Sequence, residues 1–324
     1  MGGGYLARRL GQAAITIALI VLVNFLLFRA MPGSPERILL GRIPNITPEV
    51  LEAVRVRWGL DKPVFPDQFI AYIAATAQGD LGFSFLARGQ TVVEVIGQRL
   101  WPTVLLFGIG ELIAIVIGLA LGAYSGWRRG GLVDYVGNGV ALVLYSAPYF
   151  LIGMLLLLVF ASGLGWFPTF GMVTRGQTGG TLDYLIDVGR HFVLPVTAVS
   201  IGLIGQYAIL MRSSLLETLS EDYIATARAK GLSGGRILRN HALPNALLPT
   251  VTLVAINLGY VVAGAITVEV VFNWPGLGTL TVEALTARDY PVLQGVFLLL
   301  SVAVVLANLA ADLVYGLLDP RVRT

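Results

Sequence analysis

The sequence of 324 residues contains no cysteine and only two histidines, His191 and His241. Without cysteine the chain can form no disulfide, no thiolate nucleophile and no zinc–thiolate site. Two imidazoles are also too few for a histidine metal cluster. We therefore expect neither a metal site nor cysteine chemistry.

Charge is scarce as well. Only 13% of the residues are charged and 56% are hydrophobic, whereas soluble domains average about 25% charged residues. The net charge of +3 is too small to suggest a nucleic-acid partner. These proportions indicate a protein of the lipid bilayer.

Six stretches of the sequence are long and apolar enough to cross a bilayer, which takes roughly 20 residues. They cover about 10–30, 102–124, 133–161, 192–215, 247–272 and 291–317. We expect an all-α polytopic membrane protein with six transmembrane helices. A long external segment follows the first helix, and a cytosolic loop joins the fourth to the fifth.

The basic residues orient these spans, because short loops rich in Lys and Arg stay in the cytoplasm. One face receives Arg8, Arg9, Arg128, Arg129, Arg321, Arg323 and the five basic residues of 212–245, and the short loops opposite hold only Arg175, Arg190 and Arg288. We expect both termini in the cytosol. A cleaved signal peptide is an alternative for the first span, but no small-x-small cleavage site follows it, so we interpret it as a retained anchor.

This topology divides the chain into three parts. Residues 1–30 form the cytosolic N-terminus and the first span, and residues 31–100 form an external subdomain. Residues 101–324 form the core of five spans, with its cytosolic loop at 216–246.

The external segment contains two predicted helices. Thr47-Pro48-Glu49 provides an N-cap, a first-turn proline and a first-turn acid for one of them. The other runs from about Asp67 to Gln78 and ends at Gly79. The subdomain is either a spacer over the spans or a docking surface for an extracytoplasmic protein.

Gly118, Gly122 and Gly126 recur every four residues in the second span. Glycines at this spacing let two helix backbones approach closely. We expect a tight helix crossing that serves packing and has no direct part in function.

Polar side chains inside spans are costly and often functional. The candidates for the wall of a polar path are Glu111, Gln206, Asn257 and Asn308. The alternative for each is a hydrogen bond to a neighbouring helix. Asp312 shares a helix face with Asn308, and we interpret it as structural.

Local signals predict two short helices in the cytosolic loop. Ser220 is placed to cap the first, whose opening turn holds Glu221 and Asp222, and Gly231 ends it. Ser233 is placed to cap the second, which reaches about Leu243 before Pro244 and Pro249. Because helices of about ten residues are marginal alone in water, each must bury a face. The surface that covers it is either a partner protein or anionic lipid headgroups.

The spacing of Ala225-Thr226-Ala227, Gly231, His241 and Leu243-Pro244 resembles the cytoplasmic signature loop of bacterial ABC importer permeases. That signature reads Glu-Ala-Ala, then Gly, then Ile-x-Leu-Pro. Ala225 stands where the family has Glu, and His241 where it has Ile. The resemblance implies that this coupling loop docks on an ATPase.

Further motifs are similar to the dipeptide and oligopeptide branch of the same family. They are Gly59-Leu60-Asp61-Lys62-Pro63, Gly79-Asp80-Leu81-Gly82, Thr267 to Phe272 followed by Pro275-Gly276-Leu277-Gly278, Arg288-Asp289-Tyr290-Pro291 and Asp319-Pro320-Arg321. The long external segment is similar to that of the B-type permease. This implies a C-type permease beside the chain, two ATPase domains below it and a solute-binding protein outside the bacterial inner membrane.

The chain has no Gly-x4-Gly-Lys-Ser/Thr phosphate loop. We therefore expect it to hold no cofactor and not to be an enzyme, with ATP and Mg bound by the partner ATPases. Peptides are the expected cargo, and nickel chelates and glutathione are alternatives.

Two other classes remain open to test. An intramembrane serine protease would use Ser125 with His191, which topology places about 30 Å apart, far beyond the roughly 3 Å needed. An ion-driven secondary transporter would have no use for the coupling loop.

Overall fold

The computed structural model describes residues 3–30, 52, 56, 61–87, 89–176, 179–263 and 266–318. Its elements are α1 (Gly3–Ala30), η1 (Val64–Gln68), α4 (Phe69–Ala77), α5 (Val92–Trp127), α6 (Leu132–Ser146), α7 (Tyr149–Leu156), η2 (Leu157–Gly163), α8 (Thr181–Leu219), α9 (Asp222–Ala229), α10 (Gly234–Ile237), η3 (Leu238–Ala242), α11 (Leu243–Ala246), α12 (Leu248–Ala263), α13 (Ile266–Phe272), α14 (Leu277–Ala287) and α15 (Tyr290–Leu318), where η marks a π-helical stretch. Apart from one isolated bridge between Phe83 and Thr91, the described residues contain no β-structure. The predicted all-α class is confirmed.

Of the two helices predicted in the external segment, one can be compared. The helix expected from Asp67 to Gln78 is present as the end of η1 together with α4, which ends at Ala77. Gly79 follows with φ +77°, a left-handed conformation that glycine adopts without a steric penalty. The helix expected at Thr47 lies outside the described residues.

Four of the described helices are long and apolar enough to cross a membrane: α1, α5, α8 and α15. The helices α6 and α7–η2 count as a fifth span only if the pair is taken together. The predicted stretch 247–272 is divided between α12, of 16 residues, and α13. The described residues thus contain four continuous helices long enough to span, one bent pair and two shorter apolar helices, Leu248–Asn257 and Leu277–Ala287.

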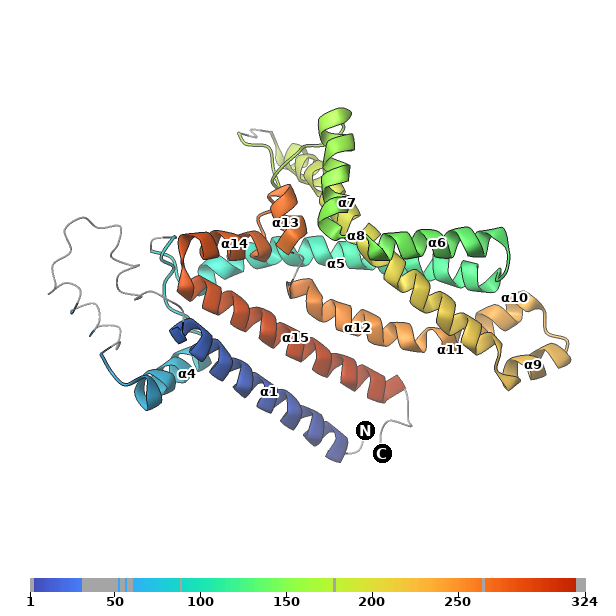
Figure 1. Ribbon diagram of the computed structural model, residues 1–324, viewed down its shortest axis with the longest axis horizontal. Coiled ribbons are helices and arrows are strands. Elements are labelled where there is room, and N and C mark those ends of the chain that lie inside the picture. The colour runs from blue at the N-terminus through green and yellow to red at the C-terminus, as the bar shows by residue number, and fades with distance from the viewer. Residues whose placement is uncertain are drawn as a thin grey trace.

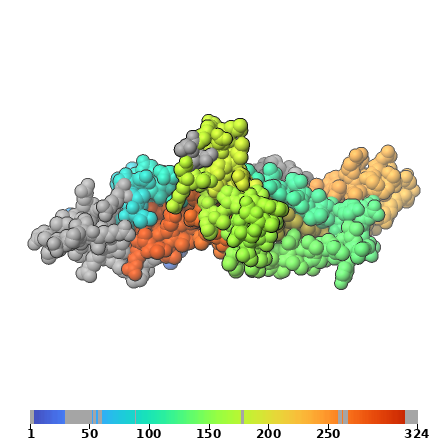
Figure 2. Space-filling model, turned by 90° about the horizontal axis from the view of Figure 1, so that it is seen from above, coloured from blue at the N-terminus to red at the C-terminus, as the bar shows by residue number. Residues whose placement is uncertain are grey.

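The predicted span 133–161 is not one straight helix, because α6 and α7 meet at an angle of 99°. The break falls at Ala147 and Pro148, both with extended backbone. Proline has no N–H to continue the helix, and its ring disfavours helical geometry in the preceding residue. As a result α7 leaves the layer of the other spans and projects from the molecule (Figure 1), and Figure 2 views the molecule from that side.

The spans are arranged in two groups. Figure 1 shows α1, α15 and α12 side by side, with α5, α6 and α8 next to them. Within the second group, α5 packs chiefly along α8. The elements α9, α10 and α11 lie at one end of the molecule, and α4 and α14 lie at the other (Figure 1).

Three glycines of α5 set the distance to α8. A Cβ atom added to Gly118 would lie 2.5 Å from the Cβ of Tyr207, and one added to Gly122 would lie 2.3 Å from the carbonyl oxygen of Ala208. A Cβ atom added to Gly126 would lie 3.3 Å from the carbonyl oxygen of Arg212. The tight crossing predicted from the glycine spacing is therefore present, and α8 is the helix that approaches.

The first and last described helices lie together. Arg9 Nη1 is 3.1 Å from Asp312 Oδ2, and the Tyr5 hydroxyl donates to the Asp312 carbonyl at 3.1 Å. These contacts place the start of α1 beside the end of α15, as Figure 1 also shows. They give Asp312 the structural role that its position predicted.

Candidate functional site

The coupling loop begins directly at the end of α8. The expected cap at Ser220 is wrong, because Ser220 still has helical backbone angles and its hydroxyl donates to the carbonyl of Glu217 at 2.6 Å. Glu221 takes the N-cap position of α9 instead, with extended backbone and no side-chain cap bond. The reason is that α8 runs on to Leu219, four residues beyond the predicted end of the span.

Gly231 ends α9 as predicted. Its φ is +77°, and its N–H donates to the Arg228 carbonyl at 2.9 Å while the N–H of Leu232 donates to the Ala227 carbonyl at 3.3 Å. These two bonds form a Schellman motif, which satisfies the last free carbonyls of a helix. The chain then turns into α10.

The second helical segment is longer than predicted. It starts after Ser233, as expected, but continues through α10, η3 and α11 to Ala246. Pro244 lies inside this segment although proline has no N–H to donate to a helix. The wider π-helical turns at Leu238–Ala242 come directly before it and accommodate the missing donor. Asn245 donates to the His241 carbonyl at 2.8 Å.

Both segments bury one face against the ends of the spans. The buried side chains are Ile224, Ala227, Ile237, Ala242 and Ala246 of the loop and Met211 and Leu215 of α8, with Trp127 of α5, Leu238 and Leu243 packed against them. A Cβ atom added to Gly234 would lie 3.3 Å from the Trp127 ring. The loop is thus fixed to the ends of α5 and α8.

The opposite face of the loop is exposed and basic. Its exposed residues include Ala225, Thr226, Arg228, Lys230, Gly231, Arg236, Arg239 and Pro244, whereas His241 and Leu243 are half-buried. Of the predicted signature residues, Ala227 faces the interior. The structure therefore divides the signature between an inner packing face and an exposed outer face.

A polar cluster lies inside the membrane part. Glu111 of α5 is only 3% exposed and accepts a hydrogen bond from the Tyr207 hydroxyl of α8. Asn257 of α12 donates its Nδ2 to the same hydroxyl oxygen at 2.9 Å. Two of the four predicted path residues are thus brought together, through a tyrosine that the sequence reading missed.

The other two predicted path residues lie apart from this chain of bonds. Gln206 is half-buried on α8, and Asn308 is exposed on α15. Tyr207 itself is fully buried. The signal that could have found it is general, because a buried tyrosine hydroxyl usually has a hydrogen-bond partner, and Glu111 and Asn257 were polar candidates within the spans.

A second buried carboxylate lies near the end of the molecule where α14 begins. Glu269 of α13 is fully buried and accepts hydrogen bonds from Thr103 Oγ1 at 2.7 Å and from the N–H groups of Gly278 at 2.7 Å and Thr279 at 3.2 Å. A carboxylate stabilises the positive N-terminal end of a helix. Glu269 therefore caps α14 and joins it to α5.

Glu269 belonged to a recognised motif, but sequence reading assigned it no role. The neighbouring glycines have a direct reason to be glycine. A Cβ atom added to Gly276 would lie 2.3 Å from the Glu269 carboxylate oxygens, and one added to Gly278 would lie 2.7 Å from the Ile266 backbone.

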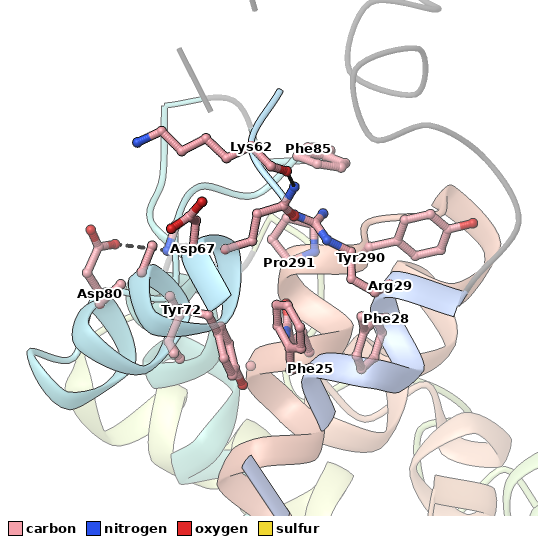
Figure 3. Close-up of a pocket in the computed structure, with 17 residues that line it drawn as sticks. Phe25, Phe28, Arg29, Lys62, Asp67, Tyr72, Asp80, Phe85, Tyr290 and Pro291 are labelled. Carbon is pink, nitrogen blue, oxygen red and sulfur yellow. Dashed lines mark hydrogen bonds between the residues drawn. The ribbon is translucent and has the colours of Figure 1, made fainter. Parts of the chain in front are cut away.

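A cavity of about 420 Å³ opens between α1, α4 and α15 near the Asp80–Gly82 turn. Figure 3 shows Phe25, Phe28 and Tyr72 on its apolar side and Lys62, Asp67 and Asp80 around its rim. None of the predicted site residues lines it. It lies where α1, α4 and α15 meet, separate from the polar cluster and the coupling loop.

The serine protease interpretation is not supported by the geometry. The Ser125 hydroxyl donates to Asp134 Oδ1 at 2.8 Å, and His191 Nδ1 lies 2.9 Å from the Asp187 carbonyl. Gly126, next to Ser125, faces Arg212, which is 21 residues beyond His191 on α8. At 1.5 Å per residue this separates the two side chains by roughly 30 Å.

Two family models match the chain. Residues 114–324 match "Binding-protein-dependent transport system inner membrane component", and residues 4–106 match "Binding-prot-dependent transport system membrane comp, N-term".

Curated relatives cover nearly the whole chain. It is 40% identical to a peptide permease protein of Brucella suis biovar 1, over 98% of both chains. It is 36% identical to a di/tripeptide transport system permease protein of Pseudomonas aeruginosa and to a glutathione transport system permease protein of Escherichia coli K12, again over 98% of each chain.

The fold is similar to that of a solved transporter. An inward-facing structure of the MetNI methionine ABC transporter superposes with a TM-score of 0.56 and 19% identity, covering 70% of this chain and 97% of the other. Together, the family models over most of the chain, the full-length relatives and the helical fold assign it: the chain belongs to the binding-protein-dependent transport system inner membrane components, the permease subunits of ABC importers, and is itself not an enzyme.

Proposed function

We propose that this chain is the B-type permease subunit of a peptide importer, in which partner ATPases drive the passage of peptides across the inner membrane. The observation that carries the proposal is the coupling loop, because its inner face is packed against α5 and α8 while its outer face is exposed and basic. The outer face suits docking to a protein with acidic groups. The inner face suits transmission of a movement to the spans.

The proposed assembly contains a C-type permease beside this chain, two ATPase domains at the coupling loop and an extracytoplasmic solute-binding protein. ATP and Mg would be held by the ATPases. The coupling residues are Ala225, Thr226, Ala227, Gly231, His241, Leu243 and Pro244. Binding protein and ATP each shift the population of outward-open and inward-open states by favouring one of them.

In this proposal both termini are cytosolic. The contact between Arg9 and Asp312 supports their being on one side, and the density of Arg and Lys there supports the cytosolic one. The division into 1–30, 31–100 and 101–324, with loop 216–246, follows from the same topology.

The proposed path runs along polar groups of the spans. Glu111 and Asn257 are its stronger candidates, since they share one hydrogen-bonded cluster. Gln206 is next to Tyr207 on α8 and is kept as a third candidate. Asn308 is exposed on α15 and fits a path only if that face meets the second permease.

Peptides are proposed as cargo because the relatives named above include peptide and di/tripeptide permeases. Glutathione is the second candidate, favoured by the relative with that name, and nickel chelates are a third. The test is to assemble the complex with its binding protein and to identify the retained ligand by native mass spectrometry. If the retained ligand is a peptide, the peptide proposal is supported. If it is glutathione or a nickel chelate, that compound takes the place of peptides as the proposed cargo.

The class of transporter is tested separately by reconstituting the purified complex in vesicles. ATP-dependent uptake supports the importer. Uptake driven by an ion gradient without any ATPase would place the chain among secondary transporters.

A further inference from the structure

The glycines of α5 make α5 and α8 one packed unit. Gly110, Gly118 and Gly122 all face α8 so closely that an added Cβ atom would lie under 3 Å from an atom of that helix. The Ser200 hydroxyl of α8 also lies 3.1 Å from the Gly110 carbonyl of α5, while 2.7 Å from the Val196 carbonyl of its own helix. Interlocked backbones of this kind leave little room for one helix to slide past the other.

The helix α12 is held differently. It packs mainly against α15, less against α5 and only lightly against α8. It follows the coupling loop directly, since α11 ends at Ala246 and α12 begins at Leu248. A movement of the loop therefore reaches α12 through a single intervening residue.

A polar cluster connects α12 to the α5–α8 unit, because Asn257 of α12 interacts with the Tyr207 hydroxyl of α8 and also with the Glu111 carboxylate of α5. Tyr207 donates its proton to Glu111 and accepts a hydrogen bond from Asn257 Nδ2. Among the described residues, the bond from Asn257 to Tyr207 is the side-chain hydrogen bond that joins α12 to α8. Since a hydroxyl carries one donor and its oxygen accepts as well, both functions of Tyr207 are used in this state.

We propose that Tyr207 is a positioning residue of the transport cycle: it clasps α12 to the α5–α8 unit in the present state and releases Asn257 when the spans rearrange. The inference rests on the proposed importer function. An interaction that exists in only one of two states shifts the population towards that state. Loss of the Tyr207 hydroxyl should therefore deplete the state seen here without altering the cargo or the ATPase contacts.

The test uses the assembled complex in vesicles, with spin labels on α8 and α12. The chain contains no cysteine, so Ser213→Cys and Leu248→Cys, both exposed, are its only labelling sites. Distances are recorded without nucleotide and after trapping with ATP and vanadate. One of the two conditions should contain the separation present in this structure.

In that condition, some complexes have the separation seen in this structure and others have the second separation. Tyr207→Phe should lower the ratio of the first population to the second roughly fivefold, which is the effect of losing one net hydrogen bond. Asn257→Leu should lower the ratio at least as much, because it removes the contact with Tyr207 and also the one with Glu111. The double variant should be no worse than Asn257→Leu alone, because the Tyr207–Asn257 contact is already absent there. Thr197→Val is the matched control, since that hydroxyl bonds to Val193 of its own helix; its ratio should stay unchanged.

Four results would overturn the clasp: unchanged ratios in both single variants, an additive double variant, an equal shift in Thr197→Val, or no condition with the present separation. If Tyr207→Phe fails to assemble, Asn257→Leu alone decides. Failure of the importer proposal is distinct, because it appears as absence of ATP-dependent uptake by the unsubstituted complex.

Discussion

Arg212 binds the carboxylate of Asp134 through two nitrogens, Nε at 2.6 Å from Oδ1 and Nη2 at 2.9 Å from Oδ2. Ser125 and the N–H of Gly130 donate to the same carboxylate at 2.8 and 3.0 Å. A single acid at the start of α6 thus joins the end of α5 to α8, beside the coupling loop.

Asp134→Asn should therefore destabilise the protein by about 2 kcal/mol, because hydrogen bonds to charged groups contribute more than neutral ones. The measurement is thermal unfolding of the purified protein in detergent. Glu283→Gln, which breaks a more exposed ion pair with Arg99, is the control and should cost less than about 1 kcal/mol. Equal effects of the two substitutions would contradict the role given to Asp134.

Gly122→Ala should loosen the α5–α8 crossing. The added methyl group meets the Ala208 backbone, which cannot move like a side-chain tip, and overpacking of this kind costs about 1–3 kcal/mol. Gly108→Ala on the same helix is the control, since nothing lies within 4 Å of its added Cβ. A fall in melting temperature for Gly108→Ala without one for Gly122→Ala would contradict the close contact of Gly122 with α8.

Glu269→Gln should weaken the cap of α14. The amide group would direct its N–H donors at the N–H groups of Gly278 or at Thr103, leaving buried polar atoms unpaired at about 1–3 kcal/mol. Glu217→Gln, on the exposed side of α8, is the matched control. The outcome to watch is thermal stability, and a variant as stable as the control would mean that the carboxylate is dispensable.

Gly231→Ala should impair coupling, because the left-handed conformation at this position costs a residue with a side chain about 1–2 kcal/mol. Gly235→Ala, in a helical position with open space around it, should be neutral. The assay is uptake per ATP hydrolysed in the reconstituted complex. Normal uptake and normal substrate-stimulated ATPase in Gly231→Ala would count against a coupling role.

Leu243→Asp should prevent assembly with the ATPases or uncouple them. The substitution puts a charge on a half-buried side chain that packs against the apolar cluster beneath the loop, and burying part of an unpaired charge is unfavourable. Co-purification of the ATPase subunits measures the first effect, and uptake measures the second. Leu248→Asp, at an exposed position just beyond the loop, is the comparison that separates burial from a general effect of charge.

Glu111→Gln should lower transport while the complex still assembles. The amide oxygen can still accept from Tyr207, so the packing of α5, α8 and α12 is retained, but the carboxylate is lost from the proposed path. Uptake is the measurement, with co-purification as the check on assembly. Unchanged uptake would remove Glu111 from the path and leave it a structural partner of Tyr207.

Features encoded within a few residues were predicted well. Gly231 and Gly79 end helices where expected, because a left-handed residue stops a helix whatever surrounds it. The glycine repeat of α5 predicted a close approach, since small side chains at this spacing leave a groove on the helix itself. The spacing of residues from Ala225 to Pro244 indicated the permease family, which the family models confirm; the coupling role of this loop stays a prediction.

Local signals failed where two of them competed. Ser220 had the right residue type for a cap, but α8 extended far enough to take it into its own last turn. Pro148 was hidden in an apolar run that hydropathy reads as continuous, although proline geometry alone is sufficient to break it.

The sequence by itself therefore determined the membrane class, the family and the helix ends at Gly79 and Gly231, because composition, motif spacing and short-range backbone preferences act without knowledge of the fold. Only the tertiary structure decided which helix meets the α5 glycines, which face of the loop is buried and what Tyr207 and Glu269 bind. Those contacts join residues such as Glu111 and Tyr207, 96 positions apart. Such pairs form because packing brings distant polar groups together inside an apolar interior, where each must find a partner.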